Sequence, residues 1–227
     1  MTEQLRVQAL HVRRGGREIL RGIDLQVDTG EVCVLMGASG AGKSTILRAI
    51  AALEPFEAGS ISVGDFVLSP GPIPPQSALR ALRGRVGMVF QAHALFEHLT
   101  VLENLTLAPM YVHGSSREAA DALALRLLDD LGIADRADAL PRRISGGEAQ
   151  RAAIARALVL DPQYLLMDEP TAALDPARRT SLAETLRSLA RQGRGILIAT
   201  HDGEFARMVA DRTCYLADGL VGRPTSS

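Results

Sequence analysis

Residues 31–44 read EVCVLMGASGAGKS, a short apolar run followed by a glycine-rich segment that ends in lysine and serine. The run 31–36 is typical of a strand buried on both faces, and the residues that follow predict a helix over 43–53. Strand, glycine-rich loop and helix in this order form one half of a βαβ unit. This stretch therefore predicts an α/β fold with a mainly parallel sheet.

The glycine-rich segment 37–44 matches the pattern G-x-x-x-x-G-K-S/T, whose backbone N–H groups can surround an anion. The expected helix adds the positive end of its dipole at the same place. Lys43 is predicted to pair with the β- and γ-phosphates of ATP, and the Ser44 hydroxyl to hold Mg²⁺. A chance match is expected in about one per cent of chains of this size or fewer. The predicted nucleotide-binding residues are Gly37, Ala38, Ser39, Gly40, Ala41, Gly42, Lys43, Ser44 and Thr45.

Two carboxylates, Asp168 and Glu169, end a second buried run at 164–167. Because the carboxyl ends of parallel strands meet at one edge of a sheet, Asp168 is expected beside the phosphate loop, where it holds Mg²⁺ through water. Glu169 faces elsewhere and is expected to act as general base on the water that attacks the γ-phosphate. The alternative, two solvated acids at a strand end, is disfavoured by the phosphate loop in the same chain.

The remaining patterns predict how the chain is organised. A helical pattern runs from 92 to 160, and its clearest helix is 115–132, where Ser115 and Glu118 fit a capping box and Gly132 ends the helix. We predict one domain, in which 1–91 and 161–227 form an α/β core with an antiparallel β part and 92–160 forms a helical subdomain. Further strands are predicted at 5–10, 19–27, 59–68, 85–91, 195–200 and 213–216, a turn at 14–17 and a helix at 177–192.

Composition and segment patterns give no support to some classes of function. The chain has 227 residues, 47% of them apolar, and a formal net charge of −1, which gives no electrostatic reason to expect nucleic-acid binding. Cys33 and Cys214 lie in apolar runs and are expected to be reduced core thiols. No signal peptide and no apolar run of about 20 residues is visible, so any action on a membrane is expected to need a partner.

Residues 144–151 read ISGGEAQR and resemble the L-S-G-G-Q signature of ABC ATPases. The resemblance covers nearly the whole chain and includes six motifs in the family's order. Gln91, Asp175 and His201 match the family's glutamine loop, D-loop and switch histidine. A GTPase would need an N-K-x-D motif, which is absent, and a kinase with a phosphate loop would lack the Ser-Gly-Gly segment.

The signature also has a physical interpretation. Ser145 offers a hydroxyl, and Gly146 and Gly147 offer open backbone N–H groups at the start of an expected helix over 148–158, which together make a second anion site. The resemblance implies a head-to-tail homodimer in which this site contacts the ATP held by the other chain. Glu148 and Asp175 are expected to contribute to the same contact in trans.

The resemblance assigns two further roles. His201 is expected to hold the γ-phosphate and the attacking water, and Gln91 to contact Mg²⁺ or that water. Arg14 stands where the family usually has an adenine-stacking aromatic residue, and its guanidinium could stack on the base instead. Ile144 and Glu148 replace the family's leucine and glutamine in the signature, and neither change is expected to prevent dimer closure.

The resemblance also implies separate membrane permease subunits and a place at the cytoplasmic face of the membrane. Residues 90–107 are expected to line the docking groove, with Ala94, Leu95 and Phe96 as exposed apolar candidates, although they could equally be core. Residues 100–114 and 205–211 resemble the polar amino-acid uptake subfamily, in which a solute-binding protein delivers the solute. The alternatives are a lipoprotein-release or cell-division complex, an ATPase of DNA repair or translation, and an inactive scaffold.

Overall fold

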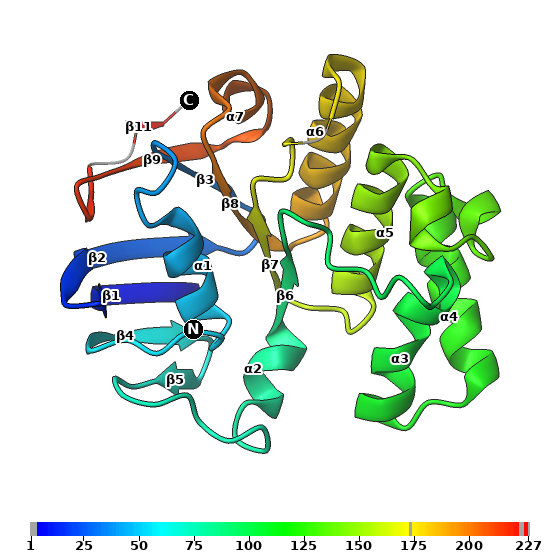
Figure 1. The fold of residues 1–227 in the computed structure, drawn as a ribbon, viewed down its shortest axis with the longest axis horizontal. Coiled ribbons are helices and arrows are strands. Elements are labelled where there is room, and N and C mark those ends of the chain that lie inside the picture. Colours follow the sequence, from blue (N-terminus) through cyan, green and yellow to red (C-terminus); the bar gives the residue numbers. More distant parts are fainter. Residues whose placement is uncertain (1–3, 173, 223–224, 227) are drawn as a thin grey trace.

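The computed structural model describes residues 4–172, 174–222 and 225–226, which form two sheets and the helices around them (Figure 1). The strands are β1 (Gln4–Arg14), β2 (Arg17–Asp28), β3 (Val32–Met36), β4 (Ala58–Val63), β5 (Phe66–Leu68), β6 (Val86–Val89), β7 (Tyr164–Asp168), β8 (Gly195–Thr200), β9 (Arg212–Ala217), β10 (Leu220–Val221) and β11 (Thr225–Ser226). The helices are α1 (Lys43–Ile50), α2 (Arg80–Arg85), α3 (Val101–His113), α4 (Arg117–Asp130), α5 (Gly146–Leu158), α6 (Pro176–Arg191) and α7 (Gly203–Val209), with 3₁₀ turns η1 (Ala134–Arg136) and η2 (Pro141–Arg143).

The central sheet has the strand order β10-β9-β3-β8-β7-β6, and β11 also pairs with β9. The strands from β9 to β6 are parallel, while β10 and β11 run antiparallel to β9. The carboxyl ends of β3, β6, β7 and β8 therefore meet at one edge, where the phosphate loop, the acidic pair and His201 follow their strands. The second sheet, β2-β1-β4-β5, is antiparallel, so the predicted fold class is confirmed.

Helix α1 is packed between the two sheets. Its apolar side chains, Ile46, Leu47 and Ile50 among them, share one core with β1, β2 and β4 and with Leu35 and Leu166 of the central sheet. The helix begins at the end of the phosphate loop, so this packing fixes the loop against both sheets. The residues predicted to bind phosphate are thus positioned by a core rather than by the loop alone.

The helices of residues 92–160 cover another part of the central sheet. Val101 of α3, Leu128 of α4 and Ile154 of α5 belong to one hydrophobic core with Met167 of β7 and Ile198 of β8. The predicted division into a core and a helical subdomain stays a prediction, and the two parts share this apolar core. Within the described ranges, no helix is both long and apolar enough to cross a membrane.

Helix boundaries differ from the predictions in instructive ways. Ser116, rather than Ser115, caps α4 by accepting a hydrogen bond from the Ala119 backbone, so the capping box predicted with Glu118 is wrong by one residue. Gly132 ends α4 as predicted: its φ of 65° is left-handed, and the next residue, Ile133, donates back to Leu128. Helices α2 and α7 were not predicted, because short helices carry little periodicity.

Candidate nucleotide-binding and hydrolysis site

The phosphate loop connects β3 to α1, and two of its glycines are required by geometry. Gly42 directly precedes α1 with a φ of 107°, a backbone conformation that residues other than glycine rarely adopt. A Cβ atom at Gly37 would lie 2.6 Å from the Leu216 carbonyl oxygen. The loop therefore holds its curved shape only with glycine at these positions, which explains why both positions of the motif G-x-x-x-x-G-K-S/T require glycine.

Lys43 is the first residue of α1, and its side chain packs against this loop and is 5% exposed. Its ammonium donates to the carbonyls of Gly37 (2.7 Å) and Ala38 (3.1 Å) and lies 3.3 Å from Glu169 Oε1. A buried cation thus lies beside two loop carbonyls at the N-terminus of α1. This arrangement suits a phosphate group, and Thr45 on the first turn of α1 is buried as well.

Ser44 and Asp168 meet at the same place although 124 residues separate them. The Ser44 hydroxyl donates to Asp168 Oδ1 over 2.9 Å, and Asp168 is 4% exposed. Burial raises the pKa of Asp168, while the hydrogen bond from Ser44 opposes that shift. A hydroxyl and a carboxylate beside a phosphate loop are the hard oxygen donors that Mg²⁺ takes together with substrate phosphates. The two residues fit the ion predicted for them.

Glu169 follows directly and lies in a different conformation. Its φ is 47°, in the left-handed region, and its backbone N–H donates to the Ala199 carbonyl over 2.8 Å. The carboxylate accepts hydrogen bonds from Thr200 Oγ1 (3.0 Å) and the His201 backbone N–H (3.3 Å). Asp168 and Glu169 are therefore turned to different neighbours, as their adjacent positions predicted.

The charge state of Glu169 follows from these contacts. Burial alone would raise its pKa, but hydrogen bonds from His201 and Thr200 and the charge of Lys43 outweigh burial and lower the pKa. His201 Nδ1 lies 3.0 Å from Glu169 Oε2. Glu169 is thus ionised at neutral pH, as a general base must be, and it lies next to the histidine expected to act with it.

Gln91 reaches the same edge of the sheet from β6. Val89 pairs with Met167 in the parallel register, so Gln91 and Glu169 each stand two residues beyond a paired position. Gln91 is exposed and follows β6 at the point where the chain turns toward the helices of residues 92–160. Its predicted contact with Mg²⁺ or water stays a prediction.

The signature residues begin α5, on the opposite side of β6 and β7 from α1 (Figure 1). Ser145 caps the helix by accepting from the Glu148 backbone (3.3 Å), and Glu148 accepts from the Ser145 backbone N–H (2.6 Å). The Arg136 Nε atom donates to the other carboxylate oxygen of Glu148 over 2.8 Å. These bonds, Arg136 first, lower the pKa of Glu148 to about 2.

The signature therefore does not meet the phosphate loop of its own chain, which agrees with a site meant for a second copy. A Cβ atom at Gly147 would lie 2.8 Å from Arg178 Cδ, so α5 and α6 approach closely here. Asp175 caps α6 by accepting from the Arg178 backbone over 2.9 Å. The contacts predicted in trans for Ser145, Gly146, Gly147, Glu148 and Asp175 stay predictions.

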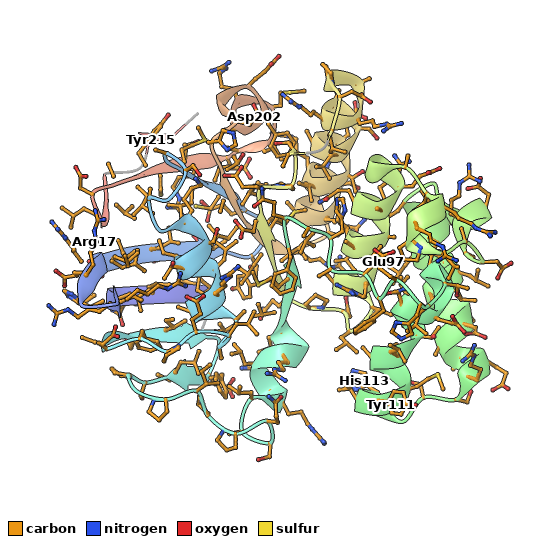
Figure 2. The ribbon with its side chains drawn as sticks, in the orientation of Figure 1. Arg17, Glu97, Tyr111, His113, Asp202 and Tyr215 are labelled. Atoms are coloured by element: carbon orange, nitrogen blue, oxygen red, sulfur yellow. The ribbon has the colours of Figure 1, made fainter. Side chains whose placement is uncertain are left out.

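A cavity of about 630 Å³ adjoins residues 38–41 of the phosphate loop. Arg17 of β2 and the turn at 217–219 line it, and Figure 2 shows Arg17 near the turn between β1 and β2. Arg14 is not among the residues lining this cavity and pairs with Glu54 instead. The stacking of Arg14 on adenine stays a prediction, and Arg17, three residues away, lines the cavity beside the loop although no sequence pattern singles it out.

A second cavity, of about 430 Å³, lies where β6 meets α3 and α5. Phe90, Ala94, Phe96, Leu107, Arg156 and Ala157 are among the residues lining it. Ala94 and Phe96 are exposed, whereas Leu95 is half-buried and packs against the core. Arg156 donates to the carbonyls of Ala94 (2.7 Å) and His93 (3.2 Å), and its guanidinium lies 5.9 Å from the centre of the Phe96 ring. Part of the predicted groove segment is therefore exposed and held in place by α5.

Comparisons with known proteins place this site in a family. A family model described as "ABC transporter" matches residues 20–172. The L-cystine transport system ATP-binding protein TcyN of Escherichia coli (strain K12) is 47% identical over 208 residues, 91% of this chain and 83% of that protein. The glutamate transport ATP-binding protein GluA of Corynebacterium glutamicum is 44% identical over 213 residues, 93% of this chain and 86% of that protein.

Among solved structures, the dimeric post-hydrolysis state of the ATP-binding cassette MJ0796, bound to ADP and Pi, has a TM-score of 0.87 and 30% identity and covers 98% of each chain. The fold, the order of the motifs and the convergence of Lys43, Asp168 and Glu169 at one sheet edge agree with this likeness. The chain therefore belongs to the ABC transporter family, and the prediction of an ABC-type ATPase is confirmed.

Proposed function

We propose that the chain hydrolyses ATP to drive uptake of a polar amino acid through separate permease subunits, at the cytoplasmic face of the membrane. The observation that carries the solute class is the set of relatives at 44–47% identity whose names specify L-cystine and glutamate transport. A solute-binding protein is expected to deliver the amino acid. No observation favours the lipoprotein-release, cell-division, DNA-repair or translation alternatives. An inactive scaffold is disfavoured because Lys43, Glu169 and His201 are all present.

The hydrolysis step follows from the contacts at the sheet edge. The ammonium of Lys43 exchanges its bonds to the loop carbonyls and to Glu169 for the β- and γ-phosphates of ATP. Glu169, ionised and held by Thr200 and His201, takes a proton from the attacking water. His201 orients that water and the γ-phosphate. Catalysis is thus positioning plus charge stabilisation, as in phosphoryl transfer generally.

Magnesium is the proposed cofactor. Ser44, Asp168 and Gln91 would hold it, with Asp168 acting through water. The support is the 2.9 Å contact between Ser44 and Asp168, two oxygen donors that suit this ion. When bound, Mg²⁺ neutralises the charge that develops on the β- and γ-phosphate oxygens.

A second copy of the chain is the proposed partner at the signature. The N-terminus of α5 presents Ser145, Gly146 and Gly147, and these groups have no phosphate to bind in their own chain. A head-to-tail dimer would bring them to the ATP of the other copy. Loss of the γ-phosphate then removes a contact that only the closed state makes, so the dimer opens.

The permease is proposed to dock in the cavity lined by Ala94, Phe96 and Arg156. An exposed phenylalanine beside a guanidinium and a cavity of about 430 Å³ suit a short amphipathic helix. The segment 90–96 also connects this cavity to Gln91. The docking groove and the nucleotide site are thus neighbours along the chain.

The test is an uptake assay in cells that lack the gene for this chain. Labelled cystine, glutamate, glutamine and arginine are offered separately, and the wild-type chain or Lys43→Ala is returned. Uptake of at least one amino acid should fall without the chain, recover with the wild type and stay low with Lys43→Ala. Unchanged uptake of every amino acid would contradict the solute class, whereas rescue by Lys43→Ala would contradict the ATP requirement.

A further inference from the structure

Arg179 links two loops of the hydrolysis site that are far apart in the sequence. It lies in the N-terminal part of α6, and its Nε atom donates to the Leu174 carbonyl over 3.2 Å. Its Nη1 atom lies 3.0 Å from Asp202 Oδ2. Leu174 directly precedes Asp175 of the D-loop, and Asp202 directly follows His201. One side chain therefore holds the D-loop and the histidine segment together.

From Asp202 the contacts continue to the general base. The Asp202 backbone N–H donates to Thr200 Oγ1 over 3.1 Å, and that hydroxyl donates to Glu169 Oε2 over 3.0 Å. Thr200 is fully buried, so its hydroxyl has few alternative positions. The path from Leu174 through Arg179, Asp202 and Thr200 to Glu169 consists of hydrogen bonds and one ion pair.

Asp202 is held from a second side as well. Its Oδ1 atom caps α7 by accepting from the backbones of Glu204 (3.1 Å) and Phe205 (3.0 Å), which leaves Oδ2 for Arg179. Figure 2 shows Asp202 beside α7, close to the N-terminal end of α6. The side chains of Arg179 and Asp202 are 33% and 14% exposed, so the pair is better shielded from water than a surface ion pair. The arrangement fixes the segment 200–202 from both α6 and α7.

We infer that Arg179 is a positioning residue that aligns Glu169 and His201 with the D-loop. Under the proposed function, on which this inference partly rests, Asp175 approaches the second copy when the dimer closes. Arg179 then transmits the position of the D-loop to the general base of the same chain. The hydrolysis step, rather than ATP binding, depends on this link, because Arg179 lines neither the phosphate loop nor its cavity.

The test compares steady-state ATP hydrolysis of wild type, Arg179→Gln, Asp202→Asn and the double variant. Asparagine still caps α7 but loses the charge that pairs with Arg179. We expect kcat to fall about tenfold or more in each single variant, because small misplacements of catalytic groups are costly. KM for ATP should change by less than about twofold, and the double variant should be no worse than either single one.

Arg187→Gln is the matched control, because it removes the same charge from an exposed position of α6. Wild-type kcat in both single variants, losses that multiply in the double variant, or a raised KM with unchanged kcat would each overturn the inference. Thermal unfolding checks that the variants fold. If Arg179→Gln does not fold, the kcat of Asp202→Asn decides the test.

A second measurement separates this inference from the proposed dimer. Arg179→Gln is combined with Glu169→Gln, and the mass of the particle is measured by light scattering with and without ATP. The combined variant should dimerise as Glu169→Gln does, since Arg179 acts on hydrolysis. If Glu169→Gln alone stays monomeric, the dimer proposal fails, while the kcat comparison still tests the contacts within one chain.

Discussion

Replacing Glu169, the proposed general base, by glutamine should separate ATP binding from hydrolysis. Glutamine has nearly the same shape, and its amide oxygen can still accept from Thr200 and from the His201 backbone, which now lie 3.0 and 3.3 Å away. The base is lost, and a general base contributes about 10²–10⁴-fold to a rate, or about 3–5 kcal/mol of the barrier. Phosphate release should therefore slow by that factor.

The same change should strengthen ATP binding. Lys43 lies 3.3 Å from Glu169, and the two side chains are 5% and 11% exposed. ATP must compete with this carboxylate for the ammonium, so removing the charge should lower the Kd for ATP, by about fivefold if the pair is worth about 1 kcal/mol. With binding intact and hydrolysis slow, the closed dimer should accumulate.

The assay is size-exclusion chromatography with light scattering, with and without Mg²⁺ and ATP, beside a titration of ATP affinity and a phosphate-release measurement. Glu204→Gln, an exposed acid of α7, serves as the matched control and should behave as wild type. A Glu169→Gln variant that binds saturating ATP but stays monomeric would refute the sandwich mechanism. Phosphate release within about threefold of wild type would refute the role of Glu169 as base.

Three other predictions follow from the site. Lys43→Ala should weaken ATP binding at least tenfold, as measured by titration, because the buried ammonium and its aim into the loop are lost; unchanged affinity would remove Lys43 from the site. Ser145→Ala should lower stability by about 1 kcal/mol through loss of the α5 cap, a fall of about 2–4 °C in Tm, and should also weaken the ATP-dependent dimer; a normal Tm would contradict the capping role. Burial raises the pKa of Asp168 above its ordinary value of 3.8, so its ionised form destabilises the nucleotide-free chain above that pH and the penalty disappears in acid. Asp168→Asn should therefore raise the Tm at pH 7 but not below about pH 3, while ATP hydrolysis with Mg²⁺ is lost; an equal Tm shift at both pH values would show that burial of the charge is not the cause.

The contribution of Glu169 to stability depends on pH in the opposite direction. Its pKa is lowered in the folded chain, so it contributes stability above its ordinary pKa of 4.5 and loses that contribution as the pH falls through the folded value. Adjacent acids of one strand end thus respond to pH in opposite directions, because one is buried against a hydroxyl and the other is held by donors and a cation.

The central parts of the fold and site could be predicted because their chemistry depends on local spacing. The phosphate loop needs glycine at fixed positions beside a strand and a helix, and Gly37 and Gly42 show why in their contacts and backbone angles. The buried runs at 31–36, 164–167 and 195–200 are typical of parallel strands, and they place Lys43, Asp168 and His201 at one edge once the sheet forms. Each of these residues can be recognised from the sequence because it lies within a few positions of another motif residue or of the end of a strand.

Other parts could not be predicted because they depend on contacts across the chain. Thr200 looks like the last residue of an apolar strand, and only the fold shows its hydroxyl between Glu169 and Asp202. Arg179 is one of several arginines on α6, and its two partners lie 5 and 23 positions away. The predicted cap of α4 is off by one residue because two serines stand side by side, and Ser115, with Glu118 three residues later, matches the capping box although Ser116 is the cap.

The backbone of Glu169 has a consequence for how such sequences change. A non-glycine residue in the left-handed region costs about 1–2 kcal/mol, and glycine or asparagine would relax it. The carboxylate at this position also pairs with Lys43 and accepts from Thr200, so a substitution sets the relief of strain against the loss of these contacts. A thermostability screen run without an activity assay would weigh only these two terms, and any variant that it selected at position 169 would have lost the proposed general base.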